Sequence, residues 1–125
     1  MKTVLITGCS SGIGHATALE FLNREWRVFA TARAVEDLGA LAEAGCETLE
    51  LDVTREEQVE RAVDAVIERA GRIDCLVNNA AYAQFGPIED VPTERVHAQF
   101  DVNLYGPHRL IRAVLPHMRE RQQGT

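Results

Sequence analysis

The small residues near the amino terminus are the clearest chemical feature of the sequence. The chain there reads Thr7-Gly8-Cys9-Ser10-Ser11-Gly12-Ile13-Gly14. Gly8 would permit a tight turn, Gly12 would leave no Cβ in the way of a phosphate, and Gly14 would let a following helix approach closely. That helix would offer free N–H groups and its positive dipole end to an anion, and Ser10 and Ser11 add hydroxyl donors. The segment predicts a dinucleotide pyrophosphate turn and not a P-loop, because no Gly-Lys-Ser/Thr follows.

The end of the second predicted strand carries a basic residue where an acidic one is often found. NAD-specific sites place Asp or Glu there to accept a hydrogen bond from the ribose 2′-hydroxyl. Here Ala32 and Arg33 occupy the position. A guanidinium can hold a 2′-phosphate through charge-assisted hydrogen bonds, whereas a carboxylate would repel it. Arg33 therefore predicts NADP(H) as the cofactor, with NAD(H) as the second choice; the alternative is a solvated surface arginine.

Polar side chains also follow the third and fourth predicted strands. Asp52, in Leu51-Asp52-Val53, can accept a hydrogen bond from an adenine amino group, although an aspartate before a helix is also common. After the fourth strand the chain reads Asn78-Asn79-Ala80-Ala81. Adjacent asparagines at the carboxyl end of a strand can bridge neighbouring loops and line a cofactor cleft. The alternative for this second segment is a simple turn.

Asn103 interrupts a stretch that otherwise predicts a helix. Asparagine is unfavourable inside a helix because its amide competes for backbone hydrogen bonds. Gly106-Pro107 follows closely and is expected to kink or divide the helix. Asn103 is therefore either part of a kink or a polar group aimed into the cleft. Apolar residues between the fourth strand and this helix could line the same cleft and favour a bulky apolar substrate: Tyr82, Phe85, Pro87 and Ile88.

Alternating strand and helix patterns supply the elements that would position these residues. Short β-branched runs predict strands at residues 3–6, 27–31, 46–51 and 73–77. Apolar residues at helical spacing predict helices at 13–22, 35–44 and 54–70 and a longer one at 93–121. The alternation predicts an α/β domain with a doubly wound parallel sheet of the Rossmann type. The expected strand order is 3-2-1-4, with right-handed crossovers and helices on both faces.

Single residues predict how the helices begin, end and pack. Ile13 is expected on the buried face of the first helix. Thr54 is expected to be the N-cap of the third helix, with Glu57 completing a capping box. Gly45 and Gly71 are expected to end the second and third helices.

Length and composition fit one domain, 1–125, and exclude several classes of function. The net charge of −6 offers no general attraction to nucleic acid or to an anionic membrane. The cysteines are scattered and the histidines lack metal-ligand spacing, so neither a disulfide framework nor a metal site is expected. No apolar run has membrane-spanning length, and no signal-peptide pattern is present, so a cytoplasmic location is expected.

These motifs together resemble the short-chain dehydrogenase/reductase family, from Thr3 to about Arg121. The glycine-rich segment is similar to the family's cofactor motif, and Asp52-Val53 to its adenine-contacting pair. Asn78-Asn79-Ala80-Ala81 is similar to its Asn-Asn-Ala-Gly motif, with Ala81 in place of the last glycine. Residues 28–33 resemble the NADP-preferring members.

The resemblance implies an oxidoreductase that interconverts a carbonyl and an alcohol on a small-molecule substrate. It implies cofactor contacts along the motifs, from Thr7, Gly8, Ser10, Ser11, Gly12, Ile13, Gly14, Arg33, Asp52, Val53, Asn79, Ala80 and Ala81. It also implies a catalytic part for Asn103, which in the family helps to hold a water of the proton relay.

The resemblance covers only the amino-terminal half of the family pattern. The family's catalytic serine and Tyr-x-x-x-Lys pair lie beyond a fifth strand, and the sequence stops at Gly124-Thr125, about where that strand would begin. The only lysine is Lys2. We therefore expect this chain to carry the cofactor-binding half without catalysing the reaction alone; the alternative is a non-catalytic nucleotide-binding fragment. The fourth strand is expected to be an uncovered apolar edge that promotes self-association.

Overall fold

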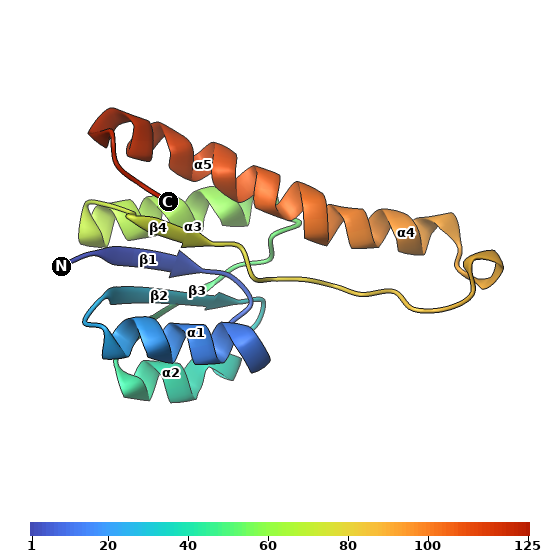
Figure 1. Ribbon diagram of the computed structural model, residues 1–125, viewed down its shortest axis with the longest axis horizontal. Helices are drawn as coiled ribbons and strands as arrows, with labels where there is room; N and C mark the ends of the chain where they lie inside the picture. Colours follow the sequence, from blue (N-terminus) through green and yellow to red (C-terminus); the bar gives the residue numbers. More distant parts are fainter.

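Four parallel strands form the sheet that carries the rest of the chain (Figure 1). The computed structural model describes all residues, 1–125. The strands are β1 (Thr3–Ile6), β2 (Arg27–Ala32), β3 (Glu47–Glu50) and β4 (Cys75–Val77). Their order is β3-β2-β1-β4, and every pair is parallel, which confirms the predicted Rossmann-type sheet. The third and fourth strands are shorter than predicted.

Helices cover both faces of this sheet, as predicted. In Figure 1, α1 (Gly12–Asn23) and α2 (Gly39–Ala44) lie below the sheet, and α3 (Glu56–Ala70) and α5 (Gly106–Arg121) lie above it. One 3₁₀ turn, Val35–Leu38, precedes α2, and another, Ile88–Asp90, lies between β4 and α4 (Thr93–Phe100). The α4 helix projects beyond the end of the sheet. No helix combines the length and the apolar character that crossing a membrane requires.

Alternate side chains of the strands build a separate core on each face. Leu5 and Phe29 point toward α3 and α5, where they pack with Val63 and Leu110. The neighbouring strand residues point toward α1 and α2, and this cluster includes Val4, Ile6, Val28, Ala30, Ala18 and Leu41. A parallel sheet covered on both faces explains why β1 and the middle of β2 are apolar at nearly every position.

The structure corrects two predictions about helix positions. Thr54 is not the N-cap of α3, since the helix begins at Glu56 with Arg55 before it, and neither end of the expected capping box forms. Thr54 lies one residue before the N-cap position, and its hydroxyl donates to the Asp52 carboxylate at 2.7 Å, which holds the loop before α3. Ile13 is 77% exposed and lies off the buried face of α1, which is formed by Gly14 and Ala18.

The long predicted helix is divided close to the expected place. α4 ends at Phe100, a π-helical turn spans Asp101–Tyr105, and α5 begins at Gly106. Pro107 lies in the first turn of α5 and has no N–H to donate back to a carbonyl of the π-turn, which fits the division of the helix there. The predicted helix ends at Gly45 and Gly71 are confirmed, since both adopt left-handed backbone angles.

β4 lies at the edge of the sheet, as expected, but its outer side is partly paired. The Thr125 N–H donates to the Asp74 carbonyl at 2.9 Å, and the Leu76 N–H donates to the Thr125 carbonyl at 2.8 Å. These two bonds on either side of Cys75 follow the pattern of parallel strands. The edge is therefore not wholly uncovered, and the expected self-association stays a prediction.

Asp74 organises the opposite end of the sheet from the carboxyl ends of the strands. Its carboxylate accepts from the Thr3 N–H at 2.8 Å, from Arg121 at 3.1 Å and from Arg72. Its side chain is only 5% exposed. The Arg72 guanidinium, helped by the other donors, holds the pKa of this carboxyl well below its usual range. β1, β4 and the end of α5 thus share one ionised group.

We expect Asp74→Asn to lower the free energy of unfolding by about 1–3 kcal/mol at neutral pH, because it removes the charge that both arginines bind. A carboxylate with a depressed pKa in the folded state stabilises the protein above its unfolded pKa of about 4, and this contribution is lost as the pH falls further. Urea unfolding between pH 7 and pH 3 should therefore show a smaller acid-induced loss for the variant than for the wild type. Asp64→Asn, at an exposed position of α3, is the control and should behave as wild type.

Candidate cofactor site

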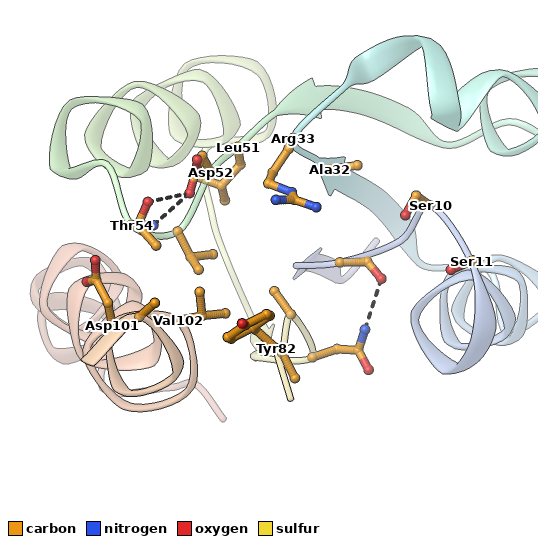
Figure 2. A pocket seen from close by; sticks show the side chains of 16 residues that line it. Ser10, Ser11, Ala32, Arg33, Leu51, Asp52, Thr54, Tyr82, Asp101 and Val102 are labelled. Carbon is orange, nitrogen blue, oxygen red and sulfur yellow. Dashed lines mark hydrogen bonds between the residues drawn. The ribbon is translucent and has the colours of Figure 1, made fainter. Parts of the chain in front are cut away.

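A pocket of about 640 Å³ opens at the carboxyl ends of the strands (Figure 2). It is lined by residues from the glycine-rich turn, the ends of β2 and β3, the segment after β4, α4 and the π-turn. Nine predicted site residues line it: Gly8, Ser10, Ser11, Arg33, Asp52, Val53, Asn79, Ala80 and Ala81. The remaining ones do not line it: Thr7, Gly12, Ile13, Gly14 and Asn103.

The glycine-rich turn is packed directly against the segment after β4. Gly8 has φ +71°, and a Cβ there would lie 2.8 Å from the Cα of Ala80. A Cβ at Gly14 would overlap the Gly8 carbonyl oxygen and the side-chain nitrogen of Asn79. Gly14 therefore allows α1 to pack against the glycine-rich turn and Asn79, whereas the sequence predicted an approach of this helix to the sheet. By contrast, a Cβ at Gly12 would meet no atom of the chain, so its proposed phosphate clearance stays a prediction.

Thr7 and Asn79 lock this packing with hydrogen bonds. The Thr7 hydroxyl accepts from the backbone N–H groups of Asn79 and Ala80, both at 3.0 Å. The Asn79 side-chain amide donates to the carbonyls of Thr7 and Gly8 at 3.2 and 3.0 Å. The predicted bridge between neighbouring loops is thus made by Asn79, while Asn78 is exposed.

The start of α1 leaves its donors available to a ligand. Ser11 occupies the N-cap position but makes no side-chain cap bond, and both Ser10 and Ser11 line the pocket. Cys9, between them and the strand, is fully buried and donates its thiol to the Ile6 carbonyl. Burial raises the pKa of Cys9 to about 11, so the turn presents hydroxyls and N–H groups to the pocket and no thiolate.

Asp52 is held in place by the residues that follow it. Its Oδ1 accepts from the N–H and the hydroxyl of Thr54, and its own N–H donates to the side chain of Gln58. Burial alone would raise the pKa of Asp52, but the Thr54 hydrogen bonds and the charges of Arg55 and Arg33 outweigh it and lower the pKa. The pocket therefore contains a fixed carboxylate that is ionised at neutral pH.

Arg33 projects into the pocket from the end of β2 (Figure 2). No hydrogen bond joins it to any other residue that lines the pocket. Its guanidinium lies in the region between Asp52 and Ser10. The site thus combines a cation that has no hydrogen bond to the lining residues, a fixed carboxylate and the open start of a helix.

Asn103 supports the pocket from outside it. Its side-chain carbonyl accepts from the Tyr82 N–H at 2.8 Å, and its amide donates to the Tyr82 carbonyl at 2.7 Å. Tyr82 lines the pocket as predicted, whereas Phe85 and Ile88 are 86% and 94% exposed and lie outside it. The polar group at Asn103 is therefore used to fix the segment after β4 against the π-turn.

Sequence reasoning missed the wall that α4 and the π-turn contribute. Ala98, Asp101 and Val102 line the pocket there. Ala98 lies in α4, and Asp101 and Val102 lie at the start of the π-turn. The only signal in the sequence was their proximity to Asn103.

We expect Thr7→Val to lower the free energy of unfolding by about 2–3 kcal/mol, because two N–H groups lose their acceptor in a buried position. Thr7→Ser keeps the hydroxyl and should cost clearly less. Urea unfolding of both variants measures the difference. Equal losses would contradict this prediction, because they would mean that the Thr7 hydroxyl stabilises the protein no more than the Thr7 methyl group does.

Comparison with known proteins places this geometry in a family. A model of the short chain dehydrogenase family matches residues 2–125. The NADPH-dependent 1-acyldihydroxyacetone phosphate reductase of Schizosaccharomyces pombe is 43% identical over 127 residues, covering 99% of this chain and 42% of that protein. The chain spans about two-fifths of the length of the curated relatives it matches.

Solved structures agree in fold. A short-chain dehydrogenase from Streptomyces avermitilis has a TM-score of 0.95 and 40% identity, over 98% of this chain and 46% of that one. A metagenomic short-chain oxidoreductase in complex with NADP has a TM-score of 0.89 and 34% identity, over 98% and 58%. The sheet order, the packed glycine-rich turn and these matches lead to one conclusion: the chain belongs to the short-chain dehydrogenase family of oxidoreductases.

Proposed function

We propose that this chain is the NADP(H)-binding part of an oxidoreductase that interconverts a carbonyl and an alcohol on a small-molecule substrate, acting in the cytoplasm. The proposed preference for NADP(H) rests on the position of Arg33. It stands where a carboxylate would select NAD(H), and it projects into the pocket without a hydrogen bond to the lining residues. A dianionic 2′-phosphate is the ligand group that best satisfies such a guanidinium.

The residues present fit the rest of a dinucleotide. The first turn of α1 and the hydroxyls of Ser10 and Ser11 would hold the pyrophosphate, with Gly12 giving clearance and Ile13 adding a backbone N–H. Asp52 would accept from the adenine amino group, with Val53 beside the ring. Asn79, Ala80 and Ala81 would border the nicotinamide half, and Thr7 and Gly14 would keep the turn in place.

Two of the relatives described above support the preference. One is an NADPH-dependent reductase, and the other is a structure solved with NADP. Both share the family of this chain, and neither fixes its cofactor or its substrate.

A bound nicotinamide would supply or accept the hydride. The chain's own residues would hold the cofactor, and Asn103 would position the Tyr82 segment next to it as the proposed contributor to a proton relay. The proton donor of the proposed reaction is not among these residues, since no Tyr-x-x-x-Lys occurs between residues 1 and 125. For this chain by itself, we therefore propose cofactor binding without turnover.

We expect the chain to bind NADPH more tightly than NADH, and Arg33→Asp to reverse that preference. Loss of a charge-assisted contact and its replacement by repulsion should weaken NADPH binding by roughly 10- to 100-fold. NADH binding should change little or improve, because the new carboxylate can accept from the ribose hydroxyl. Titration calorimetry with both cofactors measures the two dissociation constants.

Arg55→Ala is the matched control for this experiment. Arg55 also lies near the Asp52 carboxylate but does not line the pocket. It should leave the ratio of the two dissociation constants unchanged. A wild-type chain that binds neither cofactor would contradict the proposed function, and equal binding of both would contradict the assigned role of Arg33.

A further inference from the structure

Arg109 joins two walls of the candidate pocket although it does not line the pocket itself. Its Nη1 donates to the carbonyl of Val53 at 3.0 Å and to the carbonyl of Asp101 at 3.3 Å. Its Nη2 donates to the Asp101 carboxylate at 2.6 Å. The side chain is 19% exposed. One planar group on α5 therefore connects the loop after β3 to the π-turn.

The same helix leaves room for Val53 one turn earlier. A Cβ at Gly106 would lie 2.7 Å from Cγ2 of Val53, so only glycine lets the loop pack this closely. The Gly106 N–H also donates to the Asp101 carbonyl, closing the π-turn, and Arg109 is a second donor to that oxygen. Val53 is thus held by steric contact at Gly106 and by a hydrogen bond at Arg109.

The charges around Arg109 fix its orientation. The Asp101 carboxylate is a close partner, and Glu56, at the start of α3, places Oε2 at 3.5 Å from Nε. Two of its nitrogens are hydrogen-bonded to chain oxygens and the third lies 3.5 Å from Glu56, so the guanidinium has little freedom to turn toward the pocket. Its effect on a ligand would be transmitted through Val53 and Asp101, both of which line the pocket.

We propose that Arg109 is a positioning residue that sets the adenine end of the cofactor site. The inference rests on the proposed function, in which Asp52 accepts from the adenine amino group. Asp52 directly precedes Val53, so the Arg109 bond to the Val53 carbonyl limits where the Asp52 carboxylate can lie. A carboxylate reads an amino group only within hydrogen-bond distance, and a loop that shifts by an ångström loses that recognition.

The test compares NADPH with its 6-deamino analogue, in which an oxygen replaces the adenine amino group, on the full chain. Wild type should prefer NADPH. Arg109→Met keeps the length of the side chain but removes its donors, and it should reduce that preference by roughly three- to tenfold. A variant that merely destabilises the fold weakens both ligands alike and leaves the ratio unchanged. Arg112→Met, at an exposed position of the same helix, is the matched control.

Arg109→Lys keeps a charge but cannot form the forked contact, so its preference should lie between those of wild type and Arg109→Met. If the methionine variant does not fold, the lysine variant carries the test. A preference that stays at the wild-type value in a folded Arg109 variant overturns the proposal, as does an equal reduction in Arg112→Met.

Hydrogen exchange of the cofactor-free chain separates this inference from the proposed function. The Thr54 amide is bonded to the Asp52 carboxylate, so its protection reports whether the loop is held. If the wild-type chain binds neither nucleotide, the proposed function is wrong. In that case faster exchange of this amide in Arg109→Met still supports the positioning role, and unchanged exchange overturns it.

Discussion

The close approach of the glycine-rich turn to the segment after β4 is the constraint on which the site depends. Gly8 and Gly14 permit contacts that no Cβ could occupy, and Thr7 and Asn79 convert the contact into four hydrogen bonds. Because these groups are largely buried, each bond left unmade would cost more than an exposed one. This packing decides where α1 begins, and therefore where its free N–H groups point.

The rest of the pocket is built outward from that contact. The parallel sheet brings the ends of β2 and β3 beside the turn, which places Arg33 and Asp52 across the opening. The segment after β4 carries Tyr82, and Asn103 holds it to the π-turn. The segment after β4 is thus tied to the glycine-rich turn by Asn79 and to the π-turn by Asn103.

The sheet order, the helix layers and most of the pocket could be predicted from the sequence. Alternation of strands and helices sets the topology, and the carboxyl ends of parallel strands gather at one edge, so Arg33, Asp52 and Asn79 had to lie close together. What could not be predicted depends on competition between neighbours. Thr54 bonds to Asp52 instead of capping α3. Ile13 is exposed, although its neighbour Gly14 is buried. The π-turn was not predicted either, and it contains two of the residues that line the pocket, Asp101 and Val102.

The Asp74 cluster and the pocket lie at opposite ends of the same strands, and this separation has a consequence for how the chain can change. The amino ends of β1 and β4 are joined through a charged group that no ligand at the other end approaches. Residues more than about 10 Å apart and without shared partners contribute nearly additively to stability. A substitution that changes the pocket at some cost in stability could therefore be compensated at the far end of the sheet. Changes in the pocket and changes in stability can in this sense arise at different ends of the sheet.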